Sequence, residues 1–84
     1  MEVCVRLFAR ARELAGASEV LLVLPERANV AHLRAELAIR HPELQSLLRN
    51  SAIAVDAEFA EDSHLLSSGA EVALIPPVSG GGSS

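Results

Sequence analysis

Lysine, tryptophan and tyrosine are absent from this 84-residue chain, and each absence narrows what the protein can do. All seven basic residues are arginines, and the net charge is −4. Nucleic-acid binding relies on a basic face and on aromatic rings that stack on bases, so we expect no nucleic-acid partner. Without lysine, the N-terminus is the only amine to which another chain could be joined.

Long apolar runs and a leader-like start are also missing. No stretch of about 18 apolar residues is present, so we expect no membrane partner. The first ten residues, MEVCVRLFAR, lack the charged and apolar regions of a signal peptide, and we therefore expect a cytoplasmic location.

Metal-ligating and catalytic spacings are lacking as well. Cys4 is the only cysteine, which excludes an intrachain disulfide, and the histidines His32, His41 and His64 do not have the spacing of metal ligands. We expect no bound metal. Cys4 lies in an alternating apolar segment, so we interpret it as a sheet-face residue, with a nucleophile as the alternative.

Two further polar groups have simple structural interpretations. Glu61 and Asp62 fall in a polar loop, where a solvated acidic turn is the interpretation and an acid–base pair the alternative. The serines Ser67, Ser68 and Ser79 have no histidine partner and no strand–turn–helix context. Catalysis by a side chain of this chain is therefore not expected.

What the sequence does contain is a regular alternation of strand and helix patterns. Period-two alternation predicts a strand over residues 2–9, and an apolar run predicts another over 19–26. After the long helix, two or three short strands are expected over 52–60 and 71–75. Helical patterns cover 10–16, 30–41 and 42–50, with Asn29 as the N-cap of the longest. The order predicts an α+β domain, with a single sheet and one principal helix packed across one face.

The pattern also divides apolar residues between two faces. We expect Leu33 and Leu37 of the long helix to pack against Val5, Leu7 and Leu22 of the sheet. Three other residues, Phe8, Phe59 and Ile75, are expected on the face that no helix covers. Phe8 and Ile75 are out of phase with the core positions of their strands. We interpret the three as a partner-binding surface, with a second small core as the alternative.

The chain closes with IPPVSGGGSS. Pro76 and Pro77 must end the last strand, because proline cannot donate to a ladder. The arm that follows contains Val78, Ser79, Gly80 and Gly81, and its glycines suit a channel too narrow for side chains. A plain flexible linker is the alternative. The sequence thus predicts a domain over 1–77 and a flexible tail over 78–84, with a diglycine at 80–81.

Two motifs link this arrangement to a known family. The segments LFARARELAG (7–16) and GAEVALIPPVSGG (69–81) resemble the first-strand signature and the last strand with diglycine of the molybdopterin synthase small subunit. That family is a ubiquitin-like β-grasp family of sulfur carriers. The resemblance implies a β-grasp fold, with a mixed sheet.

The resemblance also implies a chemistry. An adenylating enzyme that uses ATP and Mg activates the carboxylate of Gly81, and a sulfur donor enzyme converts it into a thiocarboxylate. The tail then delivers sulfur to cyclic pyranopterin monophosphate in the large catalytic subunit, with which the small subunit forms a heterotetramer. The small subunit itself binds no cofactor and is not an enzyme on its own.

The chain departs from the family pattern in two places. Ala70 replaces an acidic turn residue, and Gly82, Ser83 and Ser84 follow the glycine that is terminal in the family. These last residues are interpreted as a segment that is removed, a link to a fused partner, or an artificial addition. Three other functions remain open: a thiamine-pathway sulfur carrier, a ubiquitin-like protein modifier, and a β-grasp binding module without tail chemistry.

Overall fold

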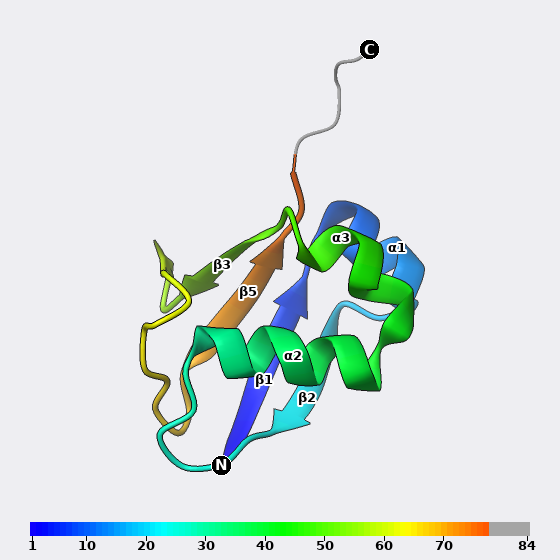
Figure 1. Cartoon of the computed structure of the whole chain (residues 1–84). Helices are drawn as coiled ribbons and strands as arrows, with labels where there is room; N and C mark the ends of the chain where they lie inside the picture. The colour runs from blue at the N-terminus through cyan, green and yellow to red at the C-terminus, as the bar shows by residue number, and fades with distance from the viewer. Residues whose placement is uncertain (78–84) are drawn as a thin grey trace.

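The computed structural model describes residues 1–77 of the chain. The elements are, in chain order, β1 (Glu2–Leu7), α1 (Ala9–Ala15), β2 (Glu19–Val23), α2 (Val30–Arg40), η1 (Pro42–Leu44), α3 (Gln45–Leu48), β3 (Ala52–Val55), β4 (Glu58–Phe59) and β5 (Glu71–Ile75) (Figure 1). The five strands form one sheet in the order β2-β1-β5-β3-β4. The predicted α+β fold is confirmed.

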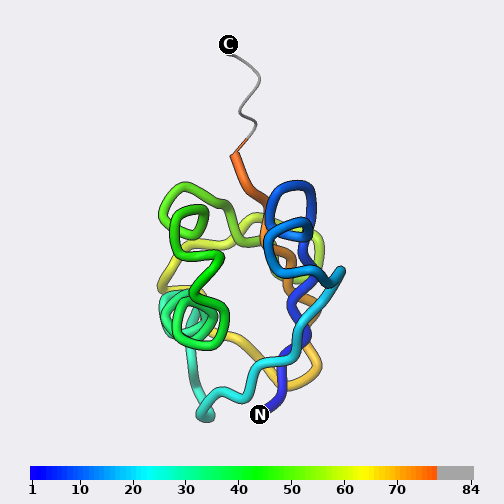
Figure 2. The backbone as a smooth tube through the Cα atoms, turned by 90° about the vertical axis from the view of Figure 1, so that its right-hand side faces the viewer, coloured from blue at the N-terminus to red at the C-terminus, as the bar shows by residue number. Residues whose placement is uncertain are grey.

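The sheet is mixed, because β1 and β5 run parallel while the other three neighbouring pairs are antiparallel. β1 pairs with β5 in parallel, β2 pairs with β1 antiparallel, and β3 pairs antiparallel with both β5 and β4. Figure 2 shows α2 and α3 together on one side of the sheet. As predicted, α2 is the principal helix and lies across one face.

One hydrophobic core lies between the sheet and the helices. The side chains that face it from the sheet alternate along each strand, as period-two patterning requires. The buried core residues include Val3, Val5, Leu7, Leu22, Leu33, Leu37, Ile53, Val55, Val72 and Leu74. Leu33 and Leu37 are fully buried, which confirms the predicted core face of the long helix.

The ends of α2 follow from local hydrogen bonds. The Asn29 side chain accepts from the backbone N–H of His32 at 2.9 Å, and the His32 ring accepts from the backbone N–H of Asn29 at 3.0 Å. This reciprocal pair satisfies two donors at the helix start, which confirms Asn29 as the N-cap. The helix ends at Arg40, two residues before Pro42, as proline disfavours helical backbone at the preceding position.

The sequence predicts two or three short strands after the long helix, and the structure has three, because the segment 52–60 folds as a hairpin of β3 and β4. β3 and β4 are joined at Asp56 and Ala57, whose φ angles are 51° and 72°. Such a turn requires positive φ at both positions and usually contains Asn or Gly, which this segment lacks. The Asp56 carboxylate accepts from the backbone N–H of Glu71 at 3.0 Å, and this tertiary contact helps to hold the turn.

Candidate functional site

The candidate site begins with the face of the sheet that the helices leave open. Ladder partners share a face, and Arg6 pairs with Ala73, Ala73 with Ala54, and Ala54 with Phe59. These four residues therefore form one row across four strands on the open face. Within residues 1–77, both α2 and α3 pack on the other side (Figure 2).

Phe8 lies at the end of this face from which the chain exits. Its side chain is 43% exposed, and the guanidinium carbon of Arg6 lies 5.9 Å from the ring centroid. This distance is within cation–π range and places the ring beside an open-face residue. Ile75 pairs with Ala52 at the same end and is half-buried. Phe8 and Ile75 thus both lie on the open face, as predicted.

Phe59 lies on the same face, at the β4 edge of the sheet, on the side away from Arg6 and Phe8. Its side chain is 77% exposed on the two-residue edge strand β4. In the strand order, β1 is the third strand from β4, after β3 and β5. At about 4.8 Å per strand, Phe59 therefore lies about 14 Å from Arg6 on β1. The side chains between them in the row are those of Ala54 and Ala73. Ala54 is only 7% exposed and Ala73 is half-buried, so the open face between the exposed side chains of Phe8 and Phe59 consists of small apolar side chains.

The strand that leads to the tail ends where the sequence predicted. β5 stops at Ile75, Pro76 is buried and Pro77 is exposed. Figure 1 shows this exit at the end of the domain that carries α1, opposite the N-terminus. The predicted arm residues Val78, Ser79, Gly80 and Gly81 lie outside the described residues, as does the rest of the predicted tail.

The end of the open face that lies away from Phe8 and the chain exit is polar. An open hollow of about 620 Å³ is lined by Cys4, Arg6, Glu19, Asp56, Gly69, Ala70 and Glu71. The Cys4 thiol donates to Glu19 Oε1 at 2.7 Å, and this hydrogen bond, with burial and the Glu19 charge, raises the pKa of Cys4. A raised pKa keeps the thiol protonated, which opposes nucleophilic chemistry. The interpretation of Cys4 as a sheet-face residue is confirmed.

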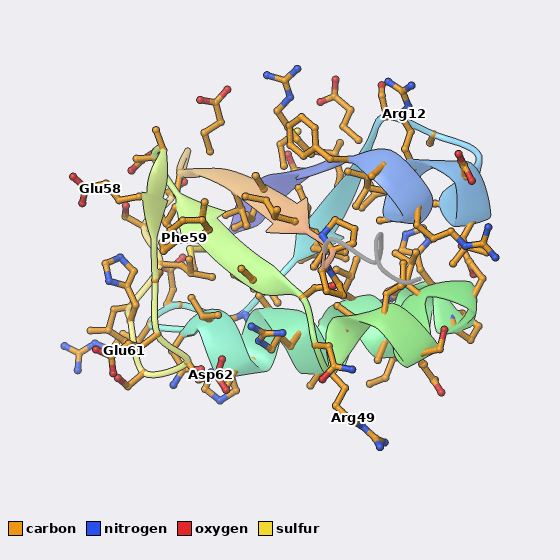
Figure 3. The ribbon with its side chains drawn as sticks, turned by 90° about the horizontal axis from the view of Figure 1, so that it is seen from above. Arg12, Arg49, Glu58, Phe59, Glu61 and Asp62 are labelled. Carbon is orange, nitrogen blue, oxygen red and sulfur yellow. The ribbon has the colours of Figure 1, made fainter. Side chains whose placement is uncertain are left out.

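The acidic loop has a structural partner on the helix side. Asp62 Oδ1 accepts from Arg34 Nε at 2.9 Å, while the other guanidinium nitrogens donate to the carbonyls of Leu48 and Ser51 at 2.6 and 2.8 Å. Figure 3 shows Glu61 and Asp62 near the start of α2, away from the open face. Arg34 therefore connects this loop to α2 and to the end of α3.

Across residues 1–77, no group of three His, Cys, Asp or Glu residues is arranged to hold a metal ion.

Sequence reasoning missed two residues of the open face. Leu21 and Val23 on β2 are 66% and 67% exposed, whereas Leu22 between them is buried. The run VLLVL (20–24) is continuously apolar, so its composition hides which residues face the core. The register with β1 places these two residues on the open face, because Leu21 lies opposite Cys4 and Val23 lies opposite Glu2.

Among residues 1–77, no helix is long and apolar enough to cross a membrane.

Comparisons with known proteins agree with this geometry. The molybdopterin synthase sulfur carrier subunit of Chlamydomonas reinhardtii is 37% identical over 83 residues, which cover 96% of this chain and all of that protein. The crystal structure of SAMP1 from Haloferax volcanii superposes with a TM-score of 0.86 at 30% identity, covering 96% of this chain and 100% of that one. These likenesses confirm the predicted β-grasp, ubiquitin-like fold.

A complex provides a third comparison. The structure of the complex of subunits 1 and 2 of the molybdopterin-converting factor from Helicobacter pylori contains a chain that superposes with a TM-score of 0.70 at 26% identity. This match covers 96% of our chain and 100% of that one. Residues 5–81 match the ThiS family. The chain therefore belongs to the ThiS family of ubiquitin-like β-grasp proteins, together with the sulfur carrier subunits of molybdopterin synthase that its two motifs resemble.

Proposed function

We propose that this protein is the sulfur carrier subunit of a molybdopterin synthase. The observation that carries the proposal is the extent of the similarity: the ThiS-family match runs from residue 5 to residue 81 and so includes the diglycine. A protein that shared only the β-grasp domain would not need to match beyond the last strand. The named relative from Chlamydomonas reinhardtii is likewise matched over its whole length.

The proposed chemistry takes place at the backbone carboxylate of Gly81. A carboxylate is a poor acyl donor until it is converted into an anhydride, so it first attacks the α-phosphate of ATP and releases pyrophosphate. Hydrosulfide supplied by the donor enzyme then attacks the acyl carbon, the bond to the phosphate oxygen breaks so that AMP leaves, and the sulfur gives up its proton. The product is a thiocarboxylate. ATP and Mg belong to the adenylating enzyme, and no cofactor is assigned to this chain.

The domain's part in this scheme is to dock and to aim the arm. Pro76 and Pro77 end β5 beside Phe8 and Ile75, so a partner that covers this end of the open face also receives the arm. The exposed ring of Phe59, beyond Ala73 and Ala54 on the same face, supplies a second anchor, since aromatic side chains often dominate interface energies. The Helicobacter pylori complex supports a large-subunit partner. We expect the assembly to be a heterotetramer, with catalysis in the large subunit.

A ubiquitin-like modifier is the second candidate, favoured by the likeness to small archaeal modifier protein 1 of Haloferax volcanii. In that case, a lysine amine of a target protein would attack the activated carbonyl of Gly81 and displace the leaving group, forming an amide. The lysine-free sequence is compatible with this function but excludes chains linked through its own lysines.

Intact mass spectrometry tests the proposal. A chain ending at Gly81 is incubated with the adenylating enzyme, ATP, Mg and a sulfide donor, and a matched variant carries Gly81→Ala. We expect the first chain to gain the mass of one sulfur in place of one oxygen, and then to support molybdopterin formation when the large subunit and its precursor are added. The variant should gain little or none.

Other results would contradict the proposal in distinguishable ways. A thiocarboxylate that the large subunit cannot use favours the thiamine-pathway carrier. Amide conjugates with lysines of other proteins, without a thiocarboxylate, favour the modifier. Full binding to partners by the Gly81→Ala variant, with no activation of either chain, favours a binding module without tail chemistry.

A further inference from the structure

The outer edge of β2 has backbone groups that point away from the sheet. Met1 and Leu24 exchange backbone hydrogen bonds with lengths of 2.6 and 2.8 Å, so they form a hydrogen-bonded pair of the antiparallel β1–β2 ladder. Such pairs recur every second residue, which makes Val20 and Leu22 the residues that bond to β1.

The residues between them face outwards. Glu19, Leu21 and Val23 occupy the non-hydrogen-bonded positions of the β1–β2 ladder, so their N–H and C=O groups point to the free edge. β2 is the last strand on its side of the sheet, and no other strand within residues 1–77 pairs with it. Figure 1 shows β2 at the side of the sheet opposite β3.

This edge carries few of the features that usually prevent edge-to-edge pairing. Natural edges are often short, interrupted by proline or a bulge, or lined with lysine. β4, at the other edge, has only two residues, whereas β2 has five, without proline and with an unbroken register to β1. Leu21 and Val23 are both about two-thirds exposed, at 66% and 67%.

We propose that β2 pairs antiparallel with β2 of a second copy of this chain, across a two-fold axis at Leu21. This inference does not rest on the proposed function. In this register, Leu21 lies opposite Leu21 of the second copy, and Glu19 lies opposite Val23. All three outward residues then meet outward residues, so every free N–H and C=O group of Glu19, Leu21 and Val23 gains a partner. Two five-stranded sheets become one continuous sheet.

Charge and packing favour this register. The two Leu21 side chains lie directly opposite, with their Cα atoms about 5.5 Å apart. The two Glu19 residues lie four positions apart along the seam, about 14 Å, which exceeds the Debye length of about 8 Å at physiological salt. Like charges are therefore separated, and each Glu19 carbon stem lies against an apolar Val23.

The helix side of the edge has room for a second strand. A groove of about 350 Å³ lies between β2 and the end of α2, lined by Leu21, Leu22, Val23, Arg40 and His41. Arg40 is already paired with Glu36 at 2.7 Å, so its charge is balanced within its own helix. Val20 of the second copy, which is half-buried in its own chain, would lie on this side of the seam, opposite Leu22.

The area involved predicts a weak dimer. Stable complexes bury about 1,200–2,000 Å² in total, and a seam of five residues per copy buries less. We expect a dissociation constant between about 10 µM and 1 mM. The dimer is therefore expected in concentrated solutions and to dissociate on dilution.

Sedimentation equilibrium of the full chain tests the proposal. We expect concentration-dependent dimers, and a dissociation constant at least about tenfold higher for Leu21→Lys, since two ammonium groups would then face each other across the axis. Leu21→Pro removes an N–H that the monomer leaves free, so it should also abolish pairing. Ile39→Lys, at a 70% exposed position on α2, is the matched control and should leave the dimer unchanged.

Hydrogen exchange identifies the seam. We expect the amides of Glu19, Leu21 and Val23 to gain protection as concentration rises, while those of Val20 and Leu22 stay protected throughout. If circular dichroism shows that Leu21→Pro does not fold, the proposal is tested by the dissociation constant of Leu21→Lys and by the hydrogen-exchange pattern. A monomer at millimolar concentration would overturn the proposal. Dimers that persist in Leu21→Lys but dissociate in Phe59→Lys would overturn it in favour of the open face. A monomer whose β2 amides become protected only with the large subunit would instead assign the edge to a strand of that partner.

Discussion

Truncation of Phe59 separates binding from folding more sharply than any other change on the open face. The ring is 77% exposed, so only about a quarter of its surface is lost from the folded packing when it becomes alanine. Full burial of a Phe side chain contributes roughly 1.5–3 kcal/mol, so the expected loss of unfolding free energy is below about 1 kcal/mol. If Phe59 anchors the partner, its truncation should cost about 2 kcal/mol or more of binding free energy, which is about a 30-fold rise in Kd.

The assay combines two measurements on the same protein. Titration calorimetry with the large subunit gives Kd, and far-ultraviolet circular dichroism gives the melting temperature, because the chain has no tryptophan or tyrosine for fluorescence. Ile39→Ala is the matched control, since Ile39 is 70% exposed on α2 rather than on the open face. Phe8→Ala should also weaken binding more than folding, with a larger folding cost because Phe8 is only 43% exposed.

Two results would refute this reasoning. An unchanged Kd for Phe59→Ala together with weaker binding by Ile39→Ala would move the partner to the helix face. A fall in melting temperature above about 8 °C for Phe59→Ala would correspond to more than about 1–2 kcal/mol and would show that the ring is packed in the folded domain.

Three further predictions concern the core, the tail and the thiol. Leu37→Ala should cost about 2–5 kcal/mol and lower the melting temperature by at least about 8 °C in thermal denaturation, because Leu37 is fully buried; an unchanged melting temperature would contradict the assigned helix face. A chain ending at Gly81 should release pyrophosphate with the adenylating enzyme and ATP, whereas one ending at Ser84 should not, and equal release by both would refute Gly81 as the activated residue. Because the pKa of Cys4 is raised, its alkylation by iodoacetamide should begin at higher pH than that of a free thiol; Glu19→Ala should move the profile to lower pH, and no movement would contradict the hydrogen bond as its cause.

Local patterns in the sequence were sufficient to predict most of the elements, and the core faces of β1 and α2. The alternation of Val3, Val5 and Leu7 defines one buried face of β1, and all three are buried. Asn29 and the spacing of Leu33 and Leu37 define the start and the buried face of α2. These predictions held because capping bonds and side-chain periodicity act over a few residues and depend little on what packs nearby.

Tertiary structure alone decided which residues meet across the sheet. The row that joins Arg6, Ala73, Ala54 and Phe59 depends on pairing between strands far apart in the sequence. Periodicity assigns faces within one strand, but it contains no information about which strand becomes its neighbour or in which register.

The hairpin at Asp56 and the exposed side chains of Leu21 and Val23 have the same origin. Positive φ at Asp56 and Ala57 carries no glycine signal, and the turn is held by contacts with Glu71, fifteen residues away. The apolar run of β2 looks buried in the sequence, yet it forms an edge because no further strand follows on that side. Short-range chemistry thus determined most elements of this protein, whereas its hairpin, the row of residues across its open face and its free edge arose only when distant strands paired, because burial depends on neighbours that the local sequence does not specify.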